Sequence, residues 1–141
     1  LVFTLRCEFL EALVIFITIA SVQCVRFNTT ARDPTSRGAE RITDVPVRIL
    51  QNTLEQFVVG CVSKLTLATF LTQRSMTLIP LLVALWCVGR VAFAIGYLLS
   101  PMRRAIGFVL TSFSTYVAIG GVAYCCYTSG IGHDIGTVAG V

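Results

Sequence analysis

Residues 76–99 read MTLIPLLVALWCVGRVAFAIGYLL, and this stretch decides the fold of the chain. It carries one charged side chain, Arg90, among apolar and small residues. A bilayer core about 30 Å thick is spanned by about 20 apolar residues of helix. Because the backbone must satisfy its own hydrogen bonds in lipid, a segment this long can cross only as a helix. The stretch therefore predicts a transmembrane helix.

The composition of the whole chain matches this segment. Of the 141 residues, 55% are hydrophobic and 13% are charged, and the mean hydropathy is +0.82. A soluble domain carries about 25% charged residues, so we expect an integral membrane protein with membrane lipids as partners. The net charge is +4, but the chain has a single lysine and no basic stripe interleaved with aromatic residues. Nucleic acid is therefore not expected as a partner.

Three further apolar segments flank the first one. We expect an all-α fold, an integral membrane four-helix bundle over residues 1–126, followed by a flexible Gly-rich tail over residues 127–141. The short turns TQRS at 72–75 and SPMRR at 100–104 make the last three helices antiparallel neighbours. The expected helices cover about residues 9–25, 47–71, 76–99 and 105–126.

Positive charge gathers at one end of this expected bundle. Seven arginines lie in or beside the first and third loops, whereas Arg6 and Arg74 lie at the other end. Since cytoplasmic loops carry an excess of Lys and Arg, we expect these two loops in the cytosol and both termini on the lumenal side. The seven are Arg26, Arg32, Arg37, Arg41, Arg48, Arg103 and Arg104.

The six cysteines do not indicate a metal site. They form no CxxC pair, and the single histidine, His133, lies in the tail. Zinc sites need four such ligands at characteristic spacing. We therefore expect no metal cofactor, and we interpret Cys24, Cys61 and Cys87 as small buried hydrophobic residues.

A group of polar residues interrupts the second apolar segment. RILQNTLEQF at 48–57 places Arg48, Gln51, Asn52 and Glu55 at i, i+3, i+4 and i+7, which is one helix face. Polar side chains within a membrane rarely face lipid. They either bond neighbouring helices together or form a polar ligand site, and the residues alone leave these two interpretations nearly even.

A second polar group follows on the third and fourth segments. Arg90, Phe93 and Tyr97 share a face, and Arg103 and Arg104 follow at the next turn. Arg90 lies about 15 Å below the turn at 1.5 Å per residue, so it needs an acidic partner. Glu55 is the one acidic residue in segments two to four, which predicts a shared network of Glu55 and Arg90.

Lys64 lies half a turn out of phase with this network. We expect its side chain either to reach toward the lumenal interface or to face the bundle axis.

Three patterns in this order resemble the MAPEG family, the membrane-associated proteins in eicosanoid and glutathione metabolism. They are R-x-x-x-N-x-x-E at 48–55, G-R followed by Tyr at 89–97, and R-x-x-G-F at 104–108. The resemblance covers about residues 47–125. It implies four transmembrane helices per chain, a homotrimer, and glutathione bound between subunits in the cytosolic half of the membrane, with the endoplasmic reticulum as the usual location.

The resemblance also implies roles for individual residues. Arg104 matches the arginine that activates the glutathione thiol in transfer or peroxide reduction on a lipophilic small-molecule substrate. Glutathione, as co-substrate, would then need groups for two carboxylates, an ammonium and two amides. The residues that match its binding faces are Arg48, Gln51, Asn52, Glu55, Arg90, Phe93, Tyr97 and Arg103.

A non-catalytic member of the same fold is the alternative. Gln51 stands where some members have a basic residue, and Phe93 stands where several active members have Tyr or His. The opening FTLRC at 3–7 is also similar to mattrin, a divergent branch of the family. These departures favour a lipid-binding or scaffolding role, whereas the N-x-x-E pair favours a retained glutathione site. A channel has less support, because the polar residues concentrate in one half of the membrane.

Overall fold

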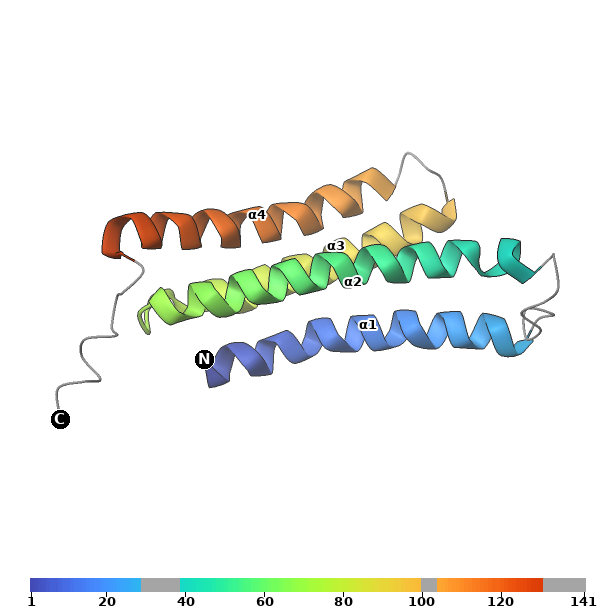
Figure 1. Ribbon diagram of the computed structural model, residues 1–141, viewed down its shortest axis with the longest axis horizontal. Helices are drawn as coiled ribbons and strands as arrows, with labels where there is room; N and C mark the ends of the chain where they lie inside the picture. Colours follow the sequence, from blue (N-terminus) through green and yellow to red (C-terminus); the bar gives the residue numbers. More distant parts are fainter. Residues whose placement is uncertain (29–38, 100–103, 131–141) are drawn as a thin grey trace.

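The computed structural model describes residues 1–28, 39–99 and 104–130, without the side chains of residues 39–42. Every long element in these ranges is an α-helix, and each helix runs antiparallel to the one before it (Figure 1). The expectation of an all-α four-helix bundle is confirmed. The helices are α1 (Val2–Asn28), α2 (Ala39–Phe70), α3 (Leu78–Leu99) and α4 (Arg104–Ser129), and the 3₁₀ turn η2 (Ser75–Thr77) precedes α3.

The first two helices begin earlier than residues 9 and 47, the expected starts. In α1 the added turns carry Thr4 and Glu8, which are buried against other helices rather than exposed to lipid. In α2 the helix continues through Pro46, which lies inside it. Residues 127–129, expected in the tail, belong to α4, and residues 131–141 lie outside the described part of the chain.

Three of the helices are both long and apolar enough to cross a membrane: α1, α3 with its leading turn, and α4. The chain is therefore a multi-pass membrane protein. The expectation that all four segments qualify by composition is not met by α2, although its 32 residues make it the longest helix. Its polar face carries the charged and amide residues that lower its hydropathy. At 1.5 Å per residue α2 is still about 48 Å long, which exceeds a bilayer core.

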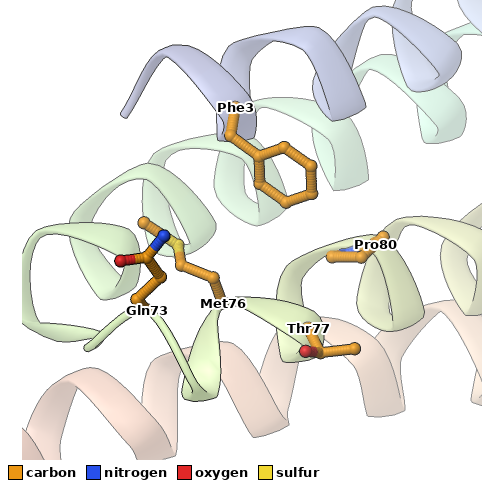
Figure 2. A pocket seen from close by; sticks show the side chains of 5 residues that line it. All are labelled: Phe3, Gln73, Met76, Thr77 and Pro80. Atoms are coloured by element: carbon orange, nitrogen blue, oxygen red, sulfur yellow. The ribbon is translucent and has the colours of Figure 1, made fainter.

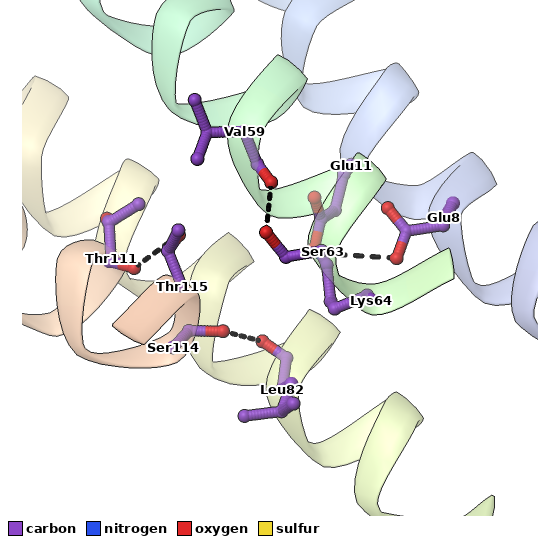
Figure 3. A network of polar contacts seen from close by, with 9 residues as sticks. All are labelled: Glu8, Glu11, Val59, Ser63, Lys64, Leu82, Thr111, Ser114 and Thr115. Carbon is purple, nitrogen blue, oxygen red and sulfur yellow. Dashed lines mark hydrogen bonds and ion pairs between the residues drawn. The ribbon is translucent and has the colours of Figure 1, made fainter. Parts of the chain in front are cut away.

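The outside of the bundle is apolar and its inside is partly polar. Phe16, Leu98 and Tyr127 are 66%, 73% and 89% exposed, as expected for side chains that meet lipid. Inside, Ser114 Oγ donates to the Leu82 carbonyl at 2.8 Å and joins α4 to α3 (Figure 3). The central apolar cluster contains Leu67, Ala68, Ile79, Leu82, Val83 and Ala118.

Helices α3 and α4 approach each other closely at two glycines. A Cβ on Gly107 would lie 2.1 Å from the Phe93 nitrogen and 2.5 Å from its Cα, and a Cβ on Gly89 would lie 2.6 Å from Thr111 Oγ1. Small residues at helix contacts are the usual way for membrane helices to gain packing energy, because lipid offers no hydrophobic drive between them. This contact sets the distance between the two helices at the level of Phe93 and Arg90.

Candidate functional site

A pocket of about 430 Å³ opens where α2, α3 and α4 meet. It collects side chains from all three helices near the end where α4 begins. Five of the nine residues that the sequence predicted for the site line it. The lining residues are Arg48, Asn52, Phe93, Tyr97, Arg104, Ala105 and Phe108.

Two arginines at this pocket have exposed guanidinium groups that can bind an anion. Arg48 is paired with Asp44 at 3.1 Å, one turn earlier on α2, and its side chain is 64% exposed. Arg104 is exposed in the first turn of α4, and its guanidinium carbon lies 5.2 Å from the centre of the Tyr97 ring. An exposed ion pair contributes little to stability, so Arg48 can turn toward an anion at small cost.

Arg90 lies behind the pocket rather than in its wall. It is 2% exposed. Its Nη1 donates to Asn52 Oδ1 at 2.8 Å, and its Nε donates to Thr111 Oγ1 at 3.1 Å. Thr111 Oγ1 in turn donates to the Gly107 carbonyl at 2.9 Å. These bonds hold Asn52 in one orientation, with its carbonyl oxygen on Arg90.

This orientation decides what Asn52 can offer a ligand. A guanidinium has only donors, so the atom of Asn52 that meets Arg90 must be the carbonyl oxygen. The amide NH2 group of Asn52 is left for the pocket, where it can donate to a carboxylate or carbonyl oxygen.

The expected network of Glu55 and Arg90 is wrong within this chain. Glu55 is exposed and accepts from Gln51 Nε2 at 3.2 Å. Arg90 is held by Asn52 and lies 4.7 Å from the Phe93 ring centre, so aromatic faces replace the expected carboxylate. Its Nη2 has no hydrogen-bond partner among the described residues.

The polar face of α2 is split between two surroundings. Gln51 and Asn52 are neighbours in sequence and so point about 100° apart around the helix. Asn52 lies on the edge that α3 and α4 cover, whereas Gln51 and Glu55 lie on the edge that they leave open. Arg103, also expected at the site, lies outside the described residues.

Lys64 faces the interior of the bundle, which is one of the two placements expected for it. Its partners come from α1. Its side chain is 1% exposed, and Nζ pairs with Glu8 at 3.2 Å and with Glu11 (Figure 3). The sequence reasoning missed this network. Its signal was present, since Thr4, Glu8 and Glu11 follow one another at i, i+4 and i+7 on a helix that is otherwise apolar.

A second pocket, of about 610 Å³, lies at the opposite end of the bundle (Figure 2). It is lined by Phe3, Gln73, Met76, Thr77 and Pro80 and holds no charged side chain. Within the described residues no group of three or more His, Cys, Asp or Glu side chains is placed to hold a metal ion.

Comparison with known proteins gives the chain a family. The model of the MAPEG family matches residues 8–124. A protein of Synechocystis sp., described as "Uncharacterized protein sll1147", is 30% identical over 115 residues, which is 79% of this chain and 79% of the relative. That description states no activity. No solved structure matches the chain.

Proposed function

Because the chain belongs to the MAPEG family, we propose that it is a membrane-bound glutathione-dependent transferase or peroxidase acting on lipophilic electrophiles. The observation that carries the proposal is the pocket where Arg48, Asn52, Tyr97 and Arg104 converge from three helices. Glutathione is the co-substrate, and a homotrimer in the endoplasmic reticulum or another endomembrane is the proposed assembly.

The side chains at the pocket suit the chemistry of glutathione. Arg48 pairs with one of its carboxylates, since arginine binds carboxylates through two parallel hydrogen bonds. Asn52 donates its amide N–H to an oxygen of the peptide. Arg104 lies beside the thiol as the catalytic residue, because a guanidinium within about 4–6 Å lowers a thiol pKa by one to three units and so yields the thiolate, which is the nucleophile.

The bilayer supplies the second substrate. Phe93, Ala105 and Phe108 form the apolar part of the pocket wall, and α3 and α4 expose apolar side chains on the surface around it. A lipophilic electrophile dissolved in the membrane can therefore reach the thiolate from the side. With the arginine-rich loops in the cytosol, the pocket faces the cytosol and both termini face the lumen.

A neighbouring subunit would complete the binding site. Gln51 and Glu55 are exposed on the open edge of α2, next to the pocket residues Arg48 and Asn52. In a trimer this edge meets the adjacent chain, so Glu55 could pair with the ammonium group of a glutathione held mainly by that chain. Arg90, which lies behind Asn52, supports the site by positioning that amide.

The alternative is a non-catalytic member that binds lipid or acts as a scaffold. The apolar Phe93 at the pocket favours it, because a phenyl ring offers no hydrogen bond to a reacting group. Thermal unfolding in detergent with increasing glutathione separates the two, since a ligand that binds only the native state raises stability with its concentration. If the thermal midpoint is unchanged at millimolar glutathione, the chain has no glutathione site of the proposed kind. If glutathione binds but no conjugation is measured, the non-catalytic alternative is favoured.

Arg104→Ala tests the catalytic assignment. We expect conjugation at pH 7 to fall by about 8- to 25-fold, because returning a thiol pKa that was lowered by one to two units to its ordinary value of about 8.5 reduces the thiolate fraction at pH 7 by that factor. The rate of the variant should recover as pH rises toward the ordinary thiol pKa of about 8.5. The measurement is the rate with a lipophilic aryl halide over pH 6–9.

The matched control is Arg74→Ala, which removes an exposed arginine at the opposite end of the bundle. It should keep the wild-type rate and pH profile. If Arg104→Ala keeps the wild-type profile too, the thiol is activated by another group.

Asn52→Asp tests the orientation of the amide. The carboxylate keeps the bond to Arg90 and adds charge pairing, so we expect the fold to be as stable as wild type. It has no N–H to donate, so glutathione affinity should fall by about 10- to 160-fold, which corresponds to about 1.5–3 kcal/mol for the loss of a hydrogen bond to a charged group. Thermal stabilisation by glutathione measures both quantities.

Gln73→Glu is the matched control for this change of amide to carboxylate, since Gln73 lies at the opposite end of the chain's helices and is exposed. Wild-type affinity in Asn52→Asp would contradict the assignment of a donor to Asn52.

A further inference from the structure

We propose that Glu8, Glu11 and Lys64 form a proton-binding site inside the bundle, which holds one exchangeable proton and keeps the network neutral at physiological pH. The site joins α1 to α2 in the half of the bundle away from the glutathione pocket. It does not depend on the proposed enzymatic function.

The three side chains are withdrawn from solvent to an unusual degree. Lys64 is 1% exposed, Glu8 is 5% exposed and Glu11 is 0% exposed. Lys64 Nζ pairs with Glu8 Oε1 at 3.2 Å and also with Glu11 Oε1. The two carboxyl groups are close enough to interact with each other as well. Figure 3 shows both glutamates of α1 directed at Lys64.

Charge alone requires a further cation here. Two carboxylates and one ammonium leave one negative charge in a region that also meets apolar helices, where an uncompensated charge is costly. The other groups that face the network are the thiols of Cys61 on α2 and Cys87 on α3. A thiol carries no positive charge, so neither cysteine balances the excess negative charge, and among the described residues no cation other than Lys64 lies at the network.

Unpartnered oxygens show where the missing proton would sit. Glu8 Oε2, Glu11 Oε2 and the hydroxyl of Thr4 are buried, and none of them has a hydrogen-bond partner in the part of the chain that the structure describes. A proton on either carboxyl group changes one acceptor into a donor that can reach another oxygen. Buried polar atoms are nearly always paired, and one added proton neutralises the network and also supplies one of the missing hydrogen bonds.

The proton site is separate from the thiol chemistry. Lys64 is twelve residues from Asn52 along α2, which is about 18 Å of helix. The site instead controls how α1 packs on the rest of the bundle. An unfolded glutamate releases its proton above about pH 4.3, whereas the folded network keeps one. Folding at neutral pH therefore takes up a proton. Because of this uptake, the free energy of unfolding falls as pH rises, until the folded site also loses its proton.

Infrared spectroscopy of the full chain in lipid tests the proposal. We expect the carbonyl band of a protonated carboxyl group at pH 7, shifted on exchange into D2O. Glu8→Gln and Glu11→Gln should each remove it, because the remaining glutamate and Lys64 balance each other. Glu55→Gln, which changes an exposed glutamate, should leave it in place. Having both variants keeps the test open if one fails to fold.

A second measurement uses the pH dependence of unfolding. The wild-type thermal midpoint should fall between pH 6 and pH 9, whereas that of Glu8→Gln should change less. No protonated band in the wild type, or a band that survives in both glutamine variants, would overturn the proposal. A further result would also overturn the proposal. If the wild-type protein lacks the carbonyl band and its thermal midpoint rises with NaCl but not with choline chloride, a sodium ion rather than a proton balances the charge.

Discussion

Gly107→Ala is expected to destabilise the bundle by more than about 3 kcal/mol, beyond the 1–3 kcal/mol usual for an overpacked core. The added Cβ would lie 2.1 Å from the nitrogen and 2.5 Å from the Cα of Phe93, and 2.7 Å from the carbonyl carbon of Ala92. These are backbone atoms of α3, so no side-chain rotation relieves the contact. The two helices must separate or slide, and every contact along them is loosened.

Gly120→Ala is the matched control, because Gly120 is on the same helix and a Cβ there meets nothing within 4 Å. Alanine is the better helix former by about 1 kcal/mol, so this variant should be as stable as wild type or slightly more stable. Thermal unfolding in detergent measures both. A wild-type midpoint in Gly107→Ala would mean that α3 and α4 are farther apart than described.

The same substitution connects the fold to the site. Phe93, whose backbone touches Gly107, lines the pocket, and the Gly107 carbonyl accepts from Thr111, which holds Arg90. A shift of α4 against α3 therefore disturbs Asn52 through Arg90 as well. Where Gly107→Ala still folds, we expect weaker stabilisation by glutathione than in Gly120→Ala.

Much of the candidate site could be predicted from spacing. Arg48 with Asn52, and Phe93 with Tyr97, are pairs one turn apart, so each pair keeps to one face whatever the helix packs against. Short turns then bring those faces together with Arg104, and the structure places all five at one pocket. Spacing of this kind is local information, and the sequence carries it directly.

The partners of Arg90 could not be predicted in this way. Charge complementarity pointed to Glu55, but the choice depends on how α2 is rotated against α3. The close contact at Gly107 brings α4 next to α3, so that Thr111 accepts a hydrogen bond from Arg90. The residue of α2 that accepts from Arg90 is Asn52 rather than Glu55. Aromatic rings supply further stabilisation that no charge count includes.

The partners of Lys64 were missed for a different reason. Glu8 and Glu11 lie more than 50 residues earlier in the chain, and their register against α2 follows from how α1 docks. Polar residues at i, i+4 and i+7 on an apolar helix show that α1 has a buried polar face, but they do not say which helix covers it.

Lys64→Met is expected to cost about 3–5 kcal/mol, the usual cost of removing one partner from a buried charged network. Methionine fills a similar volume, so the loss comes from two buried carboxyl groups without their cation. The damage should grow with pH, because the variant folds only with both carboxyl groups protonated and therefore binds two protons on folding where the wild type binds one. Thermal midpoints in detergent at pH 6 and pH 9 measure this difference.

The triple change of Lys64→Met with Glu8→Gln and Glu11→Gln separates lost charge pairing from lost packing. Replacing a whole buried ionic network with neutral groups is often neutral or stabilising, so the triple variant should regain most of the stability and lose its pH dependence. Arg6→Met, which removes an exposed cation from α1, controls for net charge and should match wild type. If Lys64→Met alone is as stable as wild type at pH 9, the two glutamates are not held by Lys64, and α1 docks through its apolar contacts.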